Sequence, residues 1–212
     1  MSDVWDARAA AYVESDAHRE GDDLEQLVAW AGGARTALDV ATGGGHVARR
    51  LREQGLEVVT LDPSPGMSPD VIARAEELPF ADGSFDVVAC RTAAHHFADP
   101  AAAVAEMARV SAGRVLLVDT EFMGEQVEQA EALRDPSHVR NYTESEWRGF
   151  AESAGLHIEI VDHFEHSFDL AAWLARTGCS GETAERAVAL LGERVQGGRL
   201  TLRKIALRAV KA

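Results

Sequence analysis

Short apolar runs alternate with stretches of helical spacing along residues 1–120. The apolar runs lie at residues 36–40, 57–61, 71–73, 85–90 and 114–119, and their lengths are typical of buried strands. Helical spacing occurs within 4–31, above all at 24–30, and again at 46–54 and 100–109. Asp22 and Asp23 are candidate caps for the helix at 24–30, as Asp99 with Pro100 is for the helix at 100–109. Because parallel strands need crossover connections, this alternation predicts an α/β fold with helices on both faces of a parallel sheet.

The pattern changes after Asp119. Residues 121–134 and 143–154 are predicted helices, and a capping-box pattern from Thr143 to Glu146 opens the second. Two long strands at 157–168 and 199–210 enclose a further predicted helix at 182–196. Gly197 and Gly198 then turn the chain into the last strand.

Composition and charge narrow the class of protein. The chain has 212 residues, of which 46% are hydrophobic, enough for one substantial core. Its net charge of -14 would repel a phosphate backbone over most of the surface, so we expect no nucleic-acid partner. With Cys90 and Cys179 as the only cysteines, neither a disulfide framework nor a cysteine-rich metal site is expected. A polar start and the lack of a long apolar run predict a cytoplasmic protein without membrane insertion.

A glycine-rich turn, Thr42-Gly43-Gly44-Gly45, joins the first strand to its helix. Glycines there let the backbone approach a ligand, although a tight turn without a ligand would look the same, and a dinucleotide-binding pattern is also met. Asp62, at the end of the second strand, can accept both hydrogen bonds of a ribose diol. Asp39 favours a cationic ligand, because a carboxylate there would repel a pyrophosphate but attract an ammonium or sulfonium group. The alternative for Asp39 is a cap for the glycine turn.

Four blocks of sequence, in order, resemble the class I S-adenosylmethionine-dependent methyltransferases, in the branch of the ubiquinone and menaquinone C-methyltransferases. The blocks are LDVATGGGH from Leu38, DPSPGM from Asp62, AEELPFADGSFDVV from Ala75 and CRTAAHHF from Cys90. The segments HREGDDL from His18 and RDPSHVR from Arg134 extend the resemblance over nearly the whole chain. It implies a Rossmann-like, seven-stranded, mostly parallel sheet in the order 3-2-1-4-5-7-6, with an antiparallel last strand and a small helical cap.

The resemblance also implies a site for S-adenosyl-L-methionine, with S-adenosyl-L-homocysteine as the product. Asp39, Ala41, Gly43 and Gly45 would surround the methionine part, Asp62 would bind the ribose, and Met67 and Ala75 would lie along the adenine. Arg91 and His96 would face the sulfur, and Tyr12 and His18 would close over the carboxylate. Thr42, Pro63, Arg74 and Glu76 complete the predicted cofactor site.

We expect a single methyltransferase domain over residues 1–212. Its parts would be an N-terminal helical cap (1–33), a cofactor-binding core (34–120), substrate-cap helices (121–155) and a C-terminal strand pair with its helix (156–212). The predicted partner is a small-molecule substrate, and the protein is expected to be a monomer or a homodimer.

Three departures from the family pattern have structural consequences. Ala41 replaces the first glycine of the motif, which alanine tolerates if its φ is negative. Arg74 stands where many relatives have an aspartate for the adenine amino group. The helix that relatives place after Met67 is missing, so we expect an uncovered sheet edge and an open adenine pocket, unless a partner chain covers it.

Methyl transfer from a sulfonium mainly requires alignment and the exclusion of water, and no covalent intermediate. A general base helps when the acceptor is a phenol, an amine or an acidic carbon, and histidine is the natural candidate. The candidates are His96 beside the cofactor, His138 in a substrate cap, and His95, although each could instead be a loop histidine bonded to the backbone. We expect His163 and His166 to be structural, and we expect no metal.

The predicted function is therefore methyl transfer to a small molecule, with aromatic or quinone-like compounds among the candidate acceptors. A non-catalytic protein that binds an adenosyl ligand is the first alternative, and an NAD(P)-dependent oxidoreductase is the second. Aromatic residues that could line an acceptor pocket, or simply pack the cap, are Trp5, Tyr12, Trp30, Trp147, Phe150 and Trp173.

Overall fold

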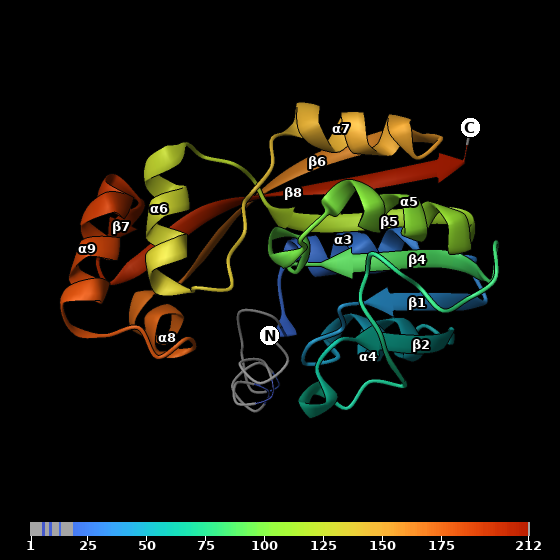
Figure 1. The fold of residues 1–212 in the computed structure, drawn as a ribbon, viewed down its shortest axis with the longest axis horizontal. Coiled ribbons are helices and arrows are strands. Elements are labelled where there is room, and N and C mark those ends of the chain that lie inside the picture. Colours follow the sequence, from blue (N-terminus) through green and yellow to red (C-terminus); the bar gives the residue numbers. More distant parts are fainter. Residues whose placement is uncertain (1–5, 7–8, 10–12, 14–18, 212) are drawn as a thin grey trace.

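The computed structural model describes Asp6, Ala9, Val13 and residues 19–211 (Figure 1). The predicted apolar runs form one sheet, whose strand order is β3-β2-β1-β4-β5-β8-β6, with β7 paired to β8. Strands β1 to β5 pair in parallel, whereas β8 is antiparallel to both β5 and β6. The Rossmann-like order is confirmed, with β8 as the predicted last strand and β7 as a short addition. The strands are β1 (Thr36–Val40), β2 (Glu57–Asp62), β3 (Val71–Ile72), β4 (Phe85–Arg91), β5 (Ser111–Thr120), β6 (Leu156–Asp169), β7 (Val195–Gln196) and β8 (Arg199–Lys211).

Helices cover both faces of the sheet because its central strands are apolar on both sides. One buried cluster joins the sheet to α5 and α7, and a second joins its opposite face to α3 and α4. The α-helices are α3 (Asp22–Trp30), α4 (His46–Glu53), α5 (Pro100–Val110), α6 (Glu125–Arg134), α7 (Glu144–Ser153), α8 (Leu170–Ala175) and α9 (Gly181–Leu191). Short 3-10 helices are η1 (Pro65–Met67), η2 (Ala94–His96) and η3 (Gly192–Arg194).

A separate lobe stands at one end of the sheet. Strands β6 and β8 continue past the parallel strands and meet α6, α8 and α9 there (Figure 1). The lobe has its own apolar cluster, in which Trp173 and Leu200 are buried. It faces the carboxyl end of β5, which is the edge where ligands of parallel sheets bind.

Several element boundaries differ from the sequence-based expectation. Gly21, not an aspartate side chain, precedes α3, and Asp23 is buried in its first turn. Helix α6 begins after Gly124, because Glu121 pairs with Tyr142 instead of entering the helix. The helix predicted at 182–196 ends at Leu191, where Gly192 has a φ of 54° that breaks the helix. Helix α8 was not predicted, although Asp169 caps it by accepting the Ala172 N–H at 2.7 Å.

Among the described residues, no helix covers the edge of the sheet beside β3, as expected from the short segment after Met67. The connection from β2 to β3 consists of residues 63–70, and its one helical element is the short η1. Ile72 in β3 is 60% exposed. Within the described part of the chain, every helix is too short or too polar to cross a lipid bilayer.

Candidate active site

The glycine-rich turn follows β1 and leads into α4. Gly43 and Gly45 have φ of 50° and 74°, a left-handed conformation that glycine adopts readily. A Cβ built on either residue would meet no atom within 4 Å, so the backbone here borders open space. The Thr42 N–H donates to the carbonyl of Leu61 at 3.0 Å and ties the turn to β2. The turn therefore presents bare backbone to a ligand.

Ala41 does not meet the condition under which alanine would be tolerated here, a negative φ. Its φ is 53°, because the turn needs left-handed geometry at the position where relatives have glycine. This conformation costs an L-residue about 1–2 kcal/mol. Thr92, just after β4, has a φ of 55°. Strained backbone at the carboxyl ends of both central strands is typical of ligand sites.

A cavity of about 480 Å³, called here the larger cavity, lies over the carboxyl ends of β1, β2 and β4. It is lined by most of the predicted cofactor residues, namely Ala41, Thr42, Gly43, Asp62, Pro63, Met67, Arg74, Ala75, Glu76, Arg91 and His96. Residues that the sequence did not single out also line it, namely Gly44, His46, Val47, Leu61, Thr92, Ala93, Phe97, Ala98 and Val139. Each of these lies within two residues of a predicted site residue, Val139 next to His138, so the predicted motifs already pointed to these segments. Tyr12 and His18 lie outside the described residues.

Asp62 is positioned by two backbone donors. Its Oδ2 accepts the N–H of Gly43 at 3.0 Å, and its Oδ1 accepts the N–H of Ser64 at 2.9 Å. Burial raises the pKa of Asp62, and these two bonds oppose the rise. A carboxylate has about four acceptor positions, so Asp62 can still accept hydrogen bonds from a ligand in the larger cavity.

Asp39 lies beneath the turn and, like Gly45, is not among the residues that line the larger cavity. Its Oδ2 accepts the hydroxyl of Thr42 at 2.6 Å and the N–H of Ala48 at 3.1 Å. Burial raises the pKa of Asp39 to about 6, against the effect of these bonds. The contacts favour the alternative role for Asp39, in which its carboxylate holds the turn in shape.

Two predicted cofactor residues are held by other side chains. Arg74 pairs with Glu76 at 3.1 Å, so the guanidinium that replaces the family's aspartate is balanced by its neighbour. Arg91 binds Asp23 through Nε at 2.8 Å, and Lys204 from β8 reaches the same carboxylate at 3.0 Å. Burial opposes ionisation of Asp23, but the charges of Lys204 and Arg91 hold its pKa well below the ordinary range. This buried network fixes α3 against β4 and β8.

His95 and Asp119 form a buried pair. Nδ1 of His95 lies 2.6 Å from Oδ1 of Asp119, and the His95 backbone N–H donates to Oδ2 at 2.8 Å. Burial disfavours the charged imidazole, but the charge and hydrogen bond of Asp119 outweigh it and raise the pKa of His95. Because a carboxylate accepts the Nδ1 proton, neutral His95 carries its lone pair on Nε2. The sequence did not single out Asp119, although it ends a central strand at the ligand-binding edge.

His96 has different properties from its neighbour. Burial, together with the charge of His95, lowers the pKa of His96 to about 3. Its Nδ1 lies 3.0 Å from the carbonyl oxygen of Ser137, which can only accept, so Nδ1 carries the proton. The two imidazole rings lie 4.1 Å apart between centroids. A neutral, weakly basic imidazole therefore lines the larger cavity.

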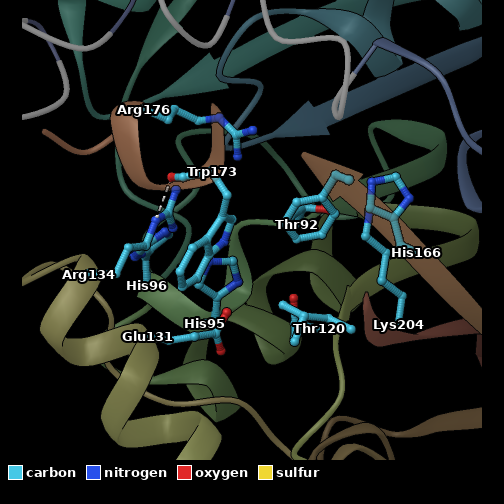
Figure 2. Close-up of a pocket in the computed structure, with 12 residues that line it drawn as sticks. Thr92, His95, His96, Thr120, Glu131, Arg134, His166, Trp173, Arg176 and Lys204 are labelled. Atoms are coloured by element: carbon cyan, nitrogen blue, oxygen red, sulfur yellow. Dashed lines mark hydrogen bonds between the residues drawn. The ribbon is translucent and has the colours of Figure 1, made fainter. Parts of the chain in front are cut away.

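A second cavity, of about 60 Å³, adjoins the first and is called here the smaller cavity (Figure 2). Thr92 and His96 line both cavities. The other residues of the smaller cavity are His95, Thr120, Glu131, Arg134, His166, Phe168, Trp173, Arg176, Leu202 and Lys204.

Other predicted histidines occupy varied places. His163 is exposed and lies 3.2 Å from Glu121, as a structural surface residue would. His166, expected to be structural, instead lines the smaller cavity. Burial, with the charge of Lys204, lowers the pKa of His166 to about 4.

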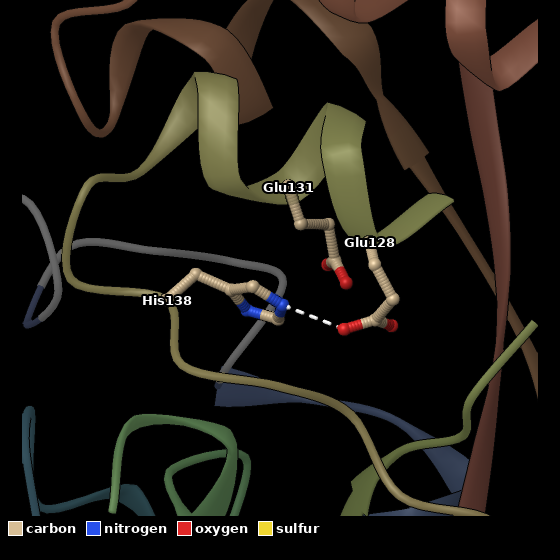
Figure 3. Close-up of side chains that lie close together, drawn as sticks. All are labelled: Glu128, Glu131 and His138. Carbon is tan, nitrogen blue, oxygen red and sulfur yellow. Dashed lines mark hydrogen bonds and ion pairs between the residues drawn. The ribbon is translucent and has the colours of Figure 1, made fainter. Parts of the chain in front are cut away.

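His138 lines neither cavity and lies with two acidic residues of α6 (Figure 3). Its Nε2 is 3.0 Å from Oε2 of Glu128, and the nearest ligand atoms of Glu128, Glu131 and His138 lie within 4.8 Å of one another. The side-chain amide of Asn141 donates to both carboxylates. The carboxylates that could hold a metal ion therefore already accept hydrogen bonds from protein donors.

The aromatic residues divide between core and cavity. Trp147 and Phe150 pack edge to face against Tyr142 in the main core, and Trp30 is buried on the opposite face of the sheet. Trp173 lines the smaller cavity, with the guanidinium of Arg134 4.7 Å from its ring centroid. Cys90 is fully buried in the core, as expected.

Comparisons with known proteins agree with this geometry. A family model described as a methyltransferase domain matches residues 38–118. The uncharacterized methyltransferase YcgJ of Bacillus subtilis is 30% identical over 204 residues, which cover 85% of this chain and 81% of that protein. A demethylmenaquinone methyltransferase of Renibacterium salmoninarum is 40% identical over 95 residues, 40% of each chain.

The structural match extends over nearly the whole chain. The crystal structure of a putative methyltransferase from Bacillus halodurans superposes with a TM-score of 0.78 at 30% identity, and the match covers 90% of this chain and 99% of that one. The sheet order, the glycine turn and the sequence matches agree, and the chain belongs to the class I S-adenosylmethionine-dependent methyltransferases.

Proposed function

We propose that this enzyme methylates a small molecule, with S-adenosylmethionine in the larger cavity and the acceptor entering from the smaller one. The observation that carries the proposal is the sharing of Thr92 and His96 by the two cavities. Two ligands in adjoining cavities can touch at the residues that line both cavities. Transfer of a methyl group from one molecule to the other requires such contact.

The residues of the larger cavity fit the cofactor. Its volume lies in the range of about 300–1,000 Å³ that is usual for cofactor pockets. Gly43 gives the backbone access that a bulky nucleoside needs, and Asp62 offers acceptor positions for a ribose diol. Met67, Ala75 and Phe97 provide apolar walls for a base. Asp39 lies below the glycine turn, and we propose that it holds the turn in position to bind the methionine part of the cofactor.

The protein contributes alignment and a dry site. When bound, S-adenosylmethionine supplies a methyl carbon on a positively charged sulfur, which leaves as a neutral thioether. Thr92 and His96 lie at the junction of the cavities, where they would orient the accepting atom. Holding the two reactants together converts a bimolecular step into a local one.

We propose His95 as the general base and His96 as a positioning residue. His95 would receive on Nε2 the proton that the acceptor loses, because Asp119 keeps the proton of neutral His95 on Nδ1. The low pKa of His96, about 3, makes it too weak a base for this role near neutral pH. His138 would position the loop before α7 through Glu128.

The proposed domain roles follow from the lining of the cavities. Residues 34–120 supply most of the larger cavity, and residues 121–155 the walls at Glu131, Arg134 and Val139. The C-terminal part, 156–212, supplies half of the described residues that line the smaller cavity, so its proposed role extends to acceptor binding. Trp173 and Phe168 support an aromatic acceptor. For the assembly, we propose a monomer or a homodimer.

Incubation with methyl-labelled S-adenosylmethionine and a small-molecule extract tests the proposal. We expect label in a product of low mass, and a loss of about 100-fold in this transfer for His95→Ala. Binding of S-adenosylhomocysteine should be unchanged in that variant. Tight binding of S-adenosylhomocysteine without any transfer would instead support the non-catalytic adenosyl-binding alternative.

A further inference from the structure

The smaller cavity concentrates positive charge at the junction with the lobe. Arg134 from α6, Arg176 from the end of α8 and Lys204 from β8 all line it (Figure 2). Glu131 is the only carboxylate among the described residues of its wall. The chain as a whole carries a net charge of -14, so a cluster of positive side chains is unusual for this protein. Asp23 pairs with Lys204 at 3.0 Å, and Asp135 lies 4.0 Å from Arg134. With three cationic side chains and one carboxylate in its wall, the cavity still favours an anionic group over a neutral one.

The pKa of Lys204 reflects the positive charges around it. Burial and the neighbouring Arg91 lower the pKa of Lys204 to about 8, even though Asp23 binds its ammonium group at 3.0 Å. Further groups that act on it are Asp119 from β5 and His166 from the facing strand β6. An anion in the cavity would stabilise the charged lysine.

Two polar atoms in this wall lack a hydrogen-bond partner. The hydroxyl of Thr92 and Nε2 of His166 are both buried and unpartnered within the described part of the chain. Buried polar atoms are nearly always satisfied, so such a pair indicates a bound ligand or water. A hydroxyl can donate a hydrogen bond, and so can an imidazole nitrogen that carries a proton. Both atoms can therefore bind the oxygens of an anion.

The size of the cavity limits the anion. A single water needs about 10–15 Å³ of this measure of volume. The 60 Å³ of the smaller cavity therefore holds a few groups of that size, such as a carboxylate. An aromatic ring does not fit inside, so only the carboxylate would occupy this cavity, and the rest of the molecule would extend towards the residues shared with the larger cavity.

We propose that the methyl acceptor carries a carboxylate, which binds in the smaller cavity among Arg134, Arg176, Lys204, Thr92 and His166. This inference rests on the proposed function, because it assigns the smaller cavity to the acceptor. The carboxylate anchors the molecule at one end, and its accepting atom then lies towards the residues that both cavities share. A carboxylate bound by a guanidinium in a partly buried site gives both affinity and orientation.

Calorimetric titration of the protein saturated with S-adenosylhomocysteine tests the anion site without requiring turnover. The probes are benzoate, its neutral analogue benzamide, and phenyl phosphate. We expect benzoate to bind at least about tenfold more tightly than benzamide, and more tightly than the bulkier phenyl phosphate. Arg176→Gln should weaken benzoate binding about tenfold and leave S-adenosylhomocysteine binding unchanged. Arg186→Gln, on the exposed face of α9 and outside both cavities, is the matched control.

Each other outcome overturns the carboxylate assignment. Equal binding of benzoate and benzamide would show that the site does not recognise the charge of the ligand. Preference for phenyl phosphate would show that the site binds a phosphate and not a carboxylate. An equal effect of Arg176→Gln and Arg186→Gln, or no binding of any probe, would move the anion away from this cavity. Failure of S-adenosylhomocysteine to bind the parent protein would contradict the proposed function itself.

Discussion

Asp119 contacts His95 at two points: its Oδ1 lies 2.6 Å from Nδ1 of the imidazole, and its Oδ2 accepts the backbone N–H of the same residue at 2.8 Å. The side chain and the main chain of His95 are therefore both fixed by one carboxylate. The pair stands at the carboxyl end of β5, next to the wall shared by the two cavities. This arrangement can hold a histidine in the orientation and tautomer of a general base.

Asp119→Asn should lower kcat by roughly 100-fold, because the imidazole loses the partner that orients it. The carboxylate charge raises the pKa of His95, so its loss should move the acid limb of the kcat profile to lower pH. Binding of S-adenosylhomocysteine should not change. Steady-state kinetics over a pH series measure both effects, with Asp82→Asn on the exposed surface as the control. An unchanged acid limb would exclude His95 as the group whose deprotonation activates the enzyme.

Ala41→Gly should increase the free energy of unfolding by about 0.5–1 kcal/mol. Relief of the left-handed φ of 53° gains about 1–2 kcal/mol, and the added flexibility of the unfolded chain returns part of it. Urea denaturation measures the difference. The same change at Ala105, on the exposed side of α5, should instead destabilise the protein by about 1 kcal/mol. A loss of stability in both variants would contradict strain at Ala41.

His166→Gln should reduce the sensitivity of stability to acid. Burial lowers the pKa of His166 to about 4, whereas in the unfolded chain it is about 6.5. Between these values the unfolded chain binds a proton that the folded chain does not, so the free energy of unfolding falls with falling pH, by at most ~1.4 kcal/mol per unit. The variant lacks this contribution and should lose less stability than the parent between about pH 7 and pH 5. Parallel stability curves from urea denaturation would be inconsistent with a buried neutral His166.

Removal of metal ions should leave methyl transfer unchanged. Asn141 and His138 already provide hydrogen-bond partners for Glu128, and Asn141 also serves Glu131. Activity before and after dialysis against a chelator measures the effect. A loss of activity that added Zn²⁺ restores in the parent but not in Glu128→Gln would instead identify these residues as metal ligands.

The sequence predicted the sheet and the larger cavity well because both depend on local signals. Apolar runs place the strands, and the strand-turn-helix motif places Gly43 and Asp62 at one edge of the parallel sheet. The sign of φ at Ala41 could not be predicted, because backbone geometry at a turn depends on the strands on both sides of it. Asp22 and Asp23 looked like caps, but a partner far along the chain, Lys204, decides the place of Asp23.

The smaller cavity could not be predicted because its wall has no local signature. His166 alternates with apolar residues like any strand position, and Arg176 follows a helix that the pattern did not indicate. His166 and Arg176 lie near Thr92 because β6 and β8 place the lobe beside the carboxyl end of β5. Long-range pairings of this kind are set by the whole fold.

The most direct test of the account is the affinity of S-adenosylhomocysteine for Asp62→Asn, measured by calorimetry beside the parent and the control Asp82→Asn. Loss of a charged acceptor for the ribose should raise the Kd of Asp62→Asn by about 10- to 100-fold, and the control should match the parent. An Asp62→Asn protein that is correctly folded and binds the ligand as tightly as the parent would contradict the placement of the cofactor in the larger cavity.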